Sequence, residues 1–463
     1  MPLPSEFLDG LRSIAGAEYV RTDESSRTAF AADALKRGAH PPDAVVFPDG
    51  ADQISAVVRL CREYLVPFVP RGGGSGFTGG SVPIRGGLVI SLERMNRILE
   101  IDEANLIAVV EPNVITGQLQ EAVECVGLFY PPDPSSLNQC AIGGNVAECA
   151  GGPRAFKYGT TKQYVLGLEA VLPNGDVVRT GGKVVKNVVG YDLTHLLVGS
   201  EGTLAIITRV ILRLIPKPPA RTTLRATFDT IEAAADAVTR VIAHRVIPAS
   251  LELIDGDSLE AVAQYLNVRA LAPERTAGLL LIEVDGLVEA VAEEAVRCEQ
   301  ACREAGATEI IRAKDEAERQ ELWRVRRELS PSLKTVSPIK FNHDVVVPKA
   351  RIPDLFGLVR RLKEEYGLRI PCFGHAGDGN IHVNIMVTPG DEEEMRRAHD
   401  AERVLFQGVV ALEGSISGEH GIGFAKARFL PIELSQATID LMKRVKQAFD
   451  PDGLLNPGKI FPE

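Results

Sequence analysis

The feature that most constrains the fold of this chain is a run of ten residues, Arg71 to Gly80, in which six positions are glycine. Such a run cannot form a packed helix or strand, because glycine loses the most backbone entropy on folding and adds no side chain to a core. It can form a loop in which consecutive backbone N–H groups point at one anion. The apolar segment before it, Val66 to Val69, indicates a buried strand that leads into this loop.

A pyrophosphate is the anion that the loop would suit, since Arg71 stands where a cation could reach a phosphate. The alternative is a flexible loop without a ligand. The run lacks the immediate helix that GxGxxG requires and the lysine of GxxxxGK[ST]. The sequence therefore favours a dinucleotide held outside a Rossmann fold.

Composition limits the class of protein. The chain has 463 residues, which predicts two or three domains, and its net charge of −11 argues against a nucleic-acid surface. None of its seven cysteines forms a CxxC pair, which indicates reduced thiols and a cytoplasmic location. We expect neither a secretory signal nor a membrane-spanning segment, because no apolar stretch is long enough. Peripheral membrane attachment and a homodimer stay open.

The order of the predicted elements indicates an α+β protein. A helix over residues 51–64 and several strands precede a long strand over 204–215, which is ended by Pro216, Pro218 and Pro219. Beyond it, residues 223–311 show the order βαββαβ, which is typical of a ferredoxin-like sheet. We place domain boundaries to give residues 1–218, 219–412 and a C-terminal segment, 413–463.

The segment from Pro131 to Thr161 has the composition of a long loop, rich in proline at its start and in glycine and alanine later. Loops of this length inside a compact domain are usually functional or disordered. Small residues such as Gly143 and Gly144 would let the backbone lie flat against a planar ligand. The segment is therefore a second candidate for the ligand site.

Four polar residues stand in glycine-bracketed turns of the last hundred positions: His375, His382, Glu419 and His420. Two imidazoles and a carboxylate suit a divalent metal with open positions, which leaves one histidine as a base. A lone histidine is mostly structural, but the whole chain has only eight. On the strand 381–386, alternation places His382 opposite the apolar residues, either toward solvent or toward a site.

Candidate anion receptors lie between these regions. Arg326 and Arg327 belong to a predicted helix over 314–329, and Lys340 interrupts an apolar segment that enters a strand. Charged residues on a helix usually form a solvated face, so Lys340 is the better candidate from the residues alone.

Six motifs together resemble the FAD-linked oxidase family of the vanillyl-alcohol oxidase type, in its metal-dependent D-2-hydroxyacid dehydrogenase branch. They are PRGGGSGFTGG, the segment from PPDPSS to KYGTT, GYDLTHLLVGSEGTLAIIT, GHAGDGNIH, SGEHGIG and DPDGLLNPGKIF, and the resemblance runs from about Pro41 to Ile460. It implies a two-part FAD-binding domain, a cap domain with the ferredoxin-like core, and a C-terminal segment that returns to the flavin.

The resemblance also implies roles for individual residues. Non-covalent FAD would be bound at its pyrophosphate, its isoalloxazine and its adenosine end, with one residue returning from the C-terminus. The residues at the pyrophosphate would be Arg71, Gly72, Gly73, Gly74, Ser75 and Gly76. Those around the isoalloxazine would be Pro132, Ser135, Ser136, Gly143, Asn145, Gly152, Tyr158, Gly159 and Thr160. The adenosine end would be bound by Glu201, Gly202 and Ile206, and the residue that returns from the C-terminus would be Asn456. One divalent metal (zinc, manganese or iron) would be held by His375, His382 and Glu419.

The activity implied is oxidation of a D-2-hydroxy acid of the D-lactate or glycolate class to the 2-oxo acid, with hydride transfer to FAD N5. His420 would be the base, while Arg326 and Lys340 would bind the substrate carboxylate. Ser330 stands where dicarboxylate relatives carry threonine, so the far end of the substrate stays open. An iron–sulfur subunit, an electron-transfer flavoprotein, a quinone or oxygen could accept the electrons. The alternatives are a non-catalytic FAD-binding subunit of a larger complex and a metal-free flavin alcohol oxidase.

Overall fold

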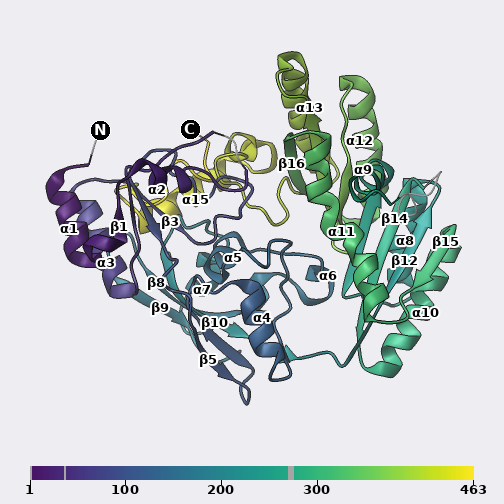
Figure 1. Ribbon diagram of the computed structural model, residues 1–463, viewed down its shortest axis with the longest axis horizontal. Coiled ribbons are helices and arrows are strands. Elements are labelled where there is room, and N and C mark those ends of the chain that lie inside the picture. Colours follow the sequence, from purple (N-terminus) through teal and green to yellow (C-terminus); the bar gives the residue numbers. More distant parts are fainter. Residues whose placement is uncertain (1–2, 36–37, 269–275, 463) are drawn as a thin grey trace. The chain divides into compact units, whose positions relative to one another are not determined.

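The computed structural model describes residues 3–35, 38–268 and 276–462. The chain divides into two compact units (Figure 1). Unit 1 comprises Met1–Gly151, Thr160–Lys217 and Glu419–Glu463, and unit 2 comprises Gly152–Gly159 and Pro218–Gly418. Among the described residues, no helix combines the length and the apolar composition needed to span a bilayer.

Unit 1 is built on two main sheets. The first has the strand order β1-β2-β4-β3, and the second has the order β5-β6-β10-β8-β9. The strands are β1 Val20–Arg21, β2 Ala44–Val46, β3 Phe68–Arg71, β4 Leu88–Ser91, β5 Ile98–Asp102, β6 Ile107–Val110, β7 Leu128–Phe129, β8 Val165–Val171, β9 Val177–Gly181, β10 Ile206–Arg213 and β11 Ile215–Pro216. The helices are α1 Ser5–Ala15, α2 Glu24–Ala29, α3 Ala51–Glu63, α4 Thr116–Glu124, α5 Ile142–Glu148, α7 Leu193–Leu197, α14 Leu430–Glu433 and α15 Gln436–Phe449.

The glycine run begins where β3 ends. β2 and β3 both pair with β4 in parallel, and α3 lies between β2 and β3 in the chain, as the periodicity of residues 51–64 predicts. Phe68 of β3 and Val57 of α3 are fully buried in one hydrophobic cluster. The loop therefore leaves a rigid, buried strand.

The segment over 131–161 was expected to be one loop, and this was wrong. It contains α5 and, in unit 2, the short helix α6, Ala155–Tyr158. The glycine pair within α5 disfavours a helix locally, but Ile142 and Val146 are fully buried, so packing outweighs propensity.

The C-terminal segment completes the sheet region of unit 1. The N–H of Phe68 donates to the carbonyl of Leu454 at 2.9 Å, and the N–H of Asn456 donates to the carbonyl of Phe68 at 2.8 Å. Residues almost 400 positions apart thus form one core.

Unit 2 contains a single seven-stranded sheet of order β15-β12-β14-β13-β17-β18-β16, with every pairing antiparallel. Its strands are β12 Ala220–Phe228, β13 Ser250–Asp255, β14 Gly278–Gly286, β15 Glu309–Arg312, β16 Ile339–Val346, β17 Cys372–His375 and β18 Asn380–Val387. Its longer helices are α8 Ile231–Ala243, α9 Gly256–Leu266, α10 Val288–Glu304, α11 Glu316–Val336, α12 Ile352–Tyr366 and α13 Glu392–Ala411. The first four strands with α8 and α10 confirm the ferredoxin-like sheet predicted from the sequence, although α9 lies between β13 and β14, where no helix was predicted.

Helices α9 and α11 cover one face of this sheet. Val325, Leu329 and Leu333 of α11 pack with Leu281 and Phe373 of the strands in one buried cluster. The predicted end of this helix at residue 329 was wrong, because α11 continues past Pro331 to Val336. The burial of Leu333 in the cluster explains how the helix tolerates a proline that removes one backbone hydrogen bond.

Candidate functional site

The glycine loop of unit 1 is packed tightly against the segment before α5. A Cβ atom added at Gly73 would lie 2.3 Å from the carbonyl oxygen of Gln139, and one at Gly72 would lie 3.3 Å from the Cβ of Ala141. The loop is therefore a defined structure, and its glycines permit the close approach of two backbones.

Arg71 supplies a buried cation at the start of the loop. Its guanidinium folds over Gly74, which has a φ of +62°, and lies 5.3 Å from the ring centroid of Phe30. Burial lowers the pKa of Arg71, partly offset by Asp33 and Glu93. Its Nη1 is buried and has no hydrogen-bond partner among the described residues. An unsatisfied buried donor beside glycine amides fits a phosphate ligand.

The residues assigned to the isoalloxazine occupy two regions of the chain. In unit 1, the N–H of Gly143 donates to Pro112 at 2.7 Å, buried Asn145 donates to Thr116 at 2.7 Å, and the carbonyl of Pro132 accepts from Gln120 at 2.8 Å. Ser135 is exposed, Ser136 is half-buried, and Thr160 caps a short helix with Gln163.

The remaining three of that set, Gly152, Tyr158 and Gly159, belong to unit 2. The hydroxyl of Tyr158 donates to Asp285 of β14 at 2.7 Å, and Lys157 pairs with the same carboxylate at 2.6 Å. These contacts fasten α6 to the sheet of unit 2.

The residues assigned to the adenosine end hold the C-terminal segment in place. The carboxylate of Glu201 accepts the N–H groups of Ile422 and Gly423 at 2.8 and 2.6 Å. Burial raises the pKa of Glu201, and these two N–H groups oppose the rise. Asn456 donates to the carbonyls of Gly80 and Glu201, both at 2.9 Å.

The two neighbours of Glu201 in that set pack rather than hydrogen-bond. Gly202 has a φ of +63°, and a Cβ there would lie 3.0 Å from Pro70. The side chain of Ile206 is buried in the hydrophobic cluster of unit 1. These residues thus connect the glycine loop to β10.

His420, also in unit 1, is held by the glycine loop. The hydroxyl of Thr78 donates to the carbonyl of His420 at 3.0 Å, and the ring of Phe77 lies 5.0 Å from the imidazole centroid. Nε2 of His420 lies 3.8 Å from the carboxylate of Glu419. Phe77 and Thr78, two of the four non-glycine residues of the run, therefore hold His420 in place, which the sequence did not reveal.

In unit 2, His375 and His382 stand on the β17–β18 hairpin. Strand pairing places His375 opposite Asn380, and His382 opposite Phe373. The rings lie 5.4 Å apart, and both side chains are buried. Because both faces of β18 are buried, the solvent-facing alternative for His382 is excluded.

Glu252 of β13 is a site residue that sequence reasoning missed. Its carboxylate contacts Nδ1 of His375 at 2.6 Å and Nε of Arg326 at 2.5 Å. Burial alone would raise the pKa of Glu252, but the charges of His375 and Arg326 and their hydrogen bonds lower it to about 2. The available signal was a glutamate in the middle of the apolar strand SLELID.

The three residues expected to hold a metal can meet. His375, His382 and Glu419 each offer one ligand atom, and these atoms lie within 4.8 Å of one another. Glu419 follows Gly418, the last residue of unit 2, whose N–H donates to Asp344 at 2.9 Å. The donor set fits a divalent metal, and since Glu252 engages Nδ1, His375 would offer Nε2.

The three candidate anion receptors differ in their surroundings. Arg326 is 7% exposed, whereas Arg327 is exposed and donates to the carbonyl of Gln320. Lys340 of β16 donates to Ser330 at 3.2 Å, and burial lowers the pKa of Lys340 to about 8, with a smaller contribution from Lys334.

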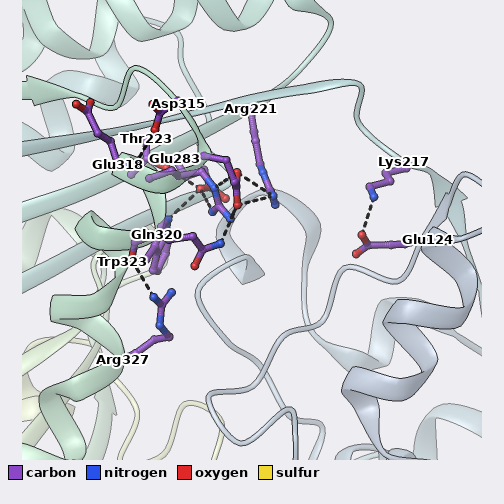
Figure 2. Close-up of polar contacts among 12 residues, drawn as sticks. Glu124, Lys217, Arg221, Thr223, Glu283, Asp315, Glu318, Gln320, Trp323 and Arg327 are labelled. Atoms are coloured by element: carbon purple, nitrogen blue, oxygen red, sulfur yellow. Dashed lines mark hydrogen bonds and ion pairs between the residues drawn. The ribbon is translucent and has the colours of Figure 1, made fainter.

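Helix α11, which carries Arg326, is fastened to the sheet by Glu283 of β14. One oxygen of this buried carboxylate accepts from Thr223, Arg319 and Trp323 at 2.7, 2.9 and 2.9 Å (Figure 2). The figure also shows the ion pair between Lys217 and Glu124 of unit 1, at 2.7 Å.

Comparisons with known proteins agree with this arrangement. The family model "FAD linked oxidases, C-terminal domain" matches residues 217–460, and the model "FAD binding domain" matches residues 42–181. The chain is 43% identical to glycolate oxidase subunit GlcD of Bacillus subtilis, covering 99% of this chain and 97% of that protein. It is 34% identical to a D-lactate dehydrogenase of Anaerostipes hadrus, covering 98% and 97%.

Among solved structures, 4-ethylphenol oxidase from Gulosibacter chungangensis superimposes with a TM-score of 0.80 at 21% identity, over 99% of this chain and 97% of that one. At this identity the likeness concerns the fold. Since one family model spans more than half of the chain and relatives above 30% identity span nearly all of it, the chain belongs to the FAD-linked oxidase family, with the two-domain fold of the vanillyl-alcohol oxidase type.

Proposed function

We propose that this protein oxidises a D-2-hydroxy acid of the D-lactate or glycolate class to the 2-oxo acid, with FAD and one divalent metal. The observation that carries the proposal is the set of polar side chains on one face of the unit 2 sheet. Pairing across β16, β17 and β18 puts Lys340, His382 and His375 on the same face, and Arg326 reaches it from α11.

This set matches the functional groups of a 2-hydroxy acid. The cations Arg326 and Lys340 would bind the carboxylate and fix its orientation. A divalent metal on His375, His382 and Glu419 would lower the pKa of the substrate hydroxyl. His420, next to Glu419 in the chain, would accept the hydroxyl proton.

The hydrogen on the adjacent carbon needs an acceptor, and FAD would take it as hydride. Unit 1 would hold this cofactor through the glycine amides and the buried Nη1 of Arg71. The names of relatives, a glycolate oxidase subunit and a D-lactate dehydrogenase, support the substrate class and a role within a multi-subunit assembly. A partner subunit with an iron–sulfur cluster, an electron-transfer flavoprotein or a quinone would then receive the electrons.

The test is anaerobic reduction of the bound flavin. Wild-type protein mixed with D-lactate or glycolate should lose its visible flavin absorbance, whereas His420→Ala should bind FAD and keep it oxidised. His244→Ala is the matched control, since His244 pairs with Glu304 at the end of α8 and has no role in the site; it should react as wild type.

Two outcomes would contradict the proposal. Rapid reduction of the flavin in His420→Ala would show that His420 is not the base. Full activity after exhaustive chelation would instead favour a metal-free flavin alcohol oxidase, and failure of wild type with every 2-hydroxy acid would favour a non-catalytic FAD-binding subunit.

A further inference from the structure

Glu252 is an unusual residue for its position. It lies in the centre of β13, where every residue is buried, and its own side chain is fully buried. A buried ion pair rarely stabilises a fold more than well-packed apolar side chains of the same size would. The burial of this carboxylate in such a strand therefore points to a role other than stability.

Each carboxylate oxygen of Glu252 has a different partner. Oε1 contacts Nδ1 of His375 at 2.6 Å, and Oε2 contacts Nε of Arg326 at 2.5 Å. Strand pairing places Glu252 directly opposite His375, so the first contact is fixed by the register of β13 and β17. The second contact comes from α11, which Glu283 fastens to the same sheet. Both contacts are thus made between rigid elements.

The contact with His375 selects one tautomer of the imidazole. An N–H at Nδ1 that donates to the carboxylate leaves the lone pair on Nε2, which is the atom that a metal requires. The contact with Arg326 selects one orientation of the guanidinium. Nε donates to Glu252, and the guanidinium carbon lies 4.9 Å from the ring centroid of Phe373, which leaves the terminal nitrogens for another group. Nη2 is buried and has no hydrogen-bond partner among the described residues, which fits a nitrogen that binds an anionic ligand.

We propose that Glu252 is a positioning residue that orients the metal-binding nitrogen of His375 and the anion-binding nitrogens of Arg326 with one carboxylate. The inference rests on the proposed function and deepens it. It makes metal affinity and affinity for the substrate carboxylate depend on a residue that contacts neither ligand.

Glu252→Gln tests this because the amide keeps the size but cannot satisfy both partners. If the amide oxygen faces His375, the NH2 group meets the N–H of Arg326. If the NH2 group faces His375, Nδ1 must accept, and the ring proton moves to Nε2, where it blocks the metal. Either orientation disturbs one function, and exchange between the two disturbs both.

The measurement is made on full-length protein stripped of metal and saturated with FAD. Zn²⁺ and Mn²⁺ affinities are determined by competition with a chelator, and KM and kcat for D-lactate are determined after reloading. Glu252→Gln should lose about 10- to 100-fold in metal affinity, the range for outer-sphere partners of metal-bound histidine. Its KM for D-lactate at saturating metal should rise about 10-fold or more, as for loss of a charged hydrogen bond.

Two further variants make the result specific. Arg326→Gln leaves the contact between Glu252 and His375 in place, so it should raise KM and keep the wild-type metal affinity. Glu283→Gln changes a buried carboxylate on the same sheet that touches neither partner; it should lower the unfolding temperature and keep the metal affinity. Should Glu252→Gln fail to fold, Glu252→Asp keeps the charge at a shorter reach and should show a smaller loss of both affinities.

Wild-type metal affinity together with a wild-type KM in Glu252→Gln would overturn the inference, since either orientation of the amide must disturb at least one of the two. The proposed function fails separately, when wild-type protein binds no metal or does not oxidise any 2-hydroxy acid. A wild type that does both while Glu252→Gln matches it would refute only the role of Glu252.

Discussion

Replacing Gly73 with alanine tests whether the loop after β3 is packed or flexible. An ideal Cβ at this position lies 2.3 Å from the backbone oxygen of Gln139, whereas ordinary contacts of a Cβ begin at about 3.4 Å. The two backbones must therefore separate by about 1 Å. Overpacking of this kind costs about 1–3 kcal/mol, which equals about a 5- to 150-fold loss in an equilibrium constant.

The loss should appear in FAD binding if the packed loop is the form that holds the pyrophosphate. Apo-protein is titrated with FAD while flavin fluorescence is followed, and thermal unfolding is recorded without FAD to detect any part of the cost that falls on stability. Gly72→Ala, with a Cβ contact of 3.3 Å, should lose less affinity, and Gly182→Ala, with no atom within 4 Å, should lose none. If Gly73→Ala binds FAD and unfolds as wild type does, the loop is flexible and the packing argument is refuted.

Three other predictions concern unit 2. Because the ammonium of Lys340 is lost as pH rises through its lowered pKa of about 8, the KM for D-lactate should increase above that pH; Lys340→Arg should abolish the increase, and a flat profile in wild type would contradict the role. Trp323→Phe removes a 2.9 Å hydrogen bond to the Glu283 carboxylate, so urea unfolding should show a free energy of unfolding lower by about 1.5–3 kcal/mol. An unchanged midpoint would show that other contacts hold α11 on the sheet. Gly357 in α12 has no atom within 4 Å of an added Cβ, so Gly357→Ala should raise the free energy of unfolding by about 0.5–1 kcal/mol, and a decrease would reveal a packing constraint.

Local patterns in the sequence predicted the parts of the fold that depend on local periodicity. The strand predicted over residues 381–386 is part of β18, and the order of elements over 223–311 predicted the ferredoxin-like sheet. The same reasoning ended α11 at residue 329, because it could not know that Leu333 would be buried against the sheet. Periodicity indicates the tendency of a segment to form a helix or a strand, but it does not reveal which other element will pack against that segment.

Contacts between residues far apart in the sequence cannot be predicted from local patterns. Glu252 finds its partners 74 and 123 positions away, and the carboxylate of Glu201 is held by N–H groups 221 and 222 positions away. Glu252 stands in an apolar segment and Glu201 in a glycine-rich one, so each is unusual for its surroundings, but the sequence does not identify its partner. A single acidic residue in an apolar or glycine-rich segment is therefore the signal that a sequence offers for such networks, and the structure is needed to identify its partners.

The segment SGEHGIG connects the proposed metal ligand to the proposed base within one short stretch of the chain. Gly418 is anchored to Asp344 of unit 2, and the carbonyl of His420 is anchored to Thr78 of unit 1. Glu419 lies between them, and its carboxylate is 3.8 Å from Nε2 of His420. The proposed metal ligand and the proposed base are thus adjacent residues, so a peptide bond limits their separation whatever the arrangement of the two units.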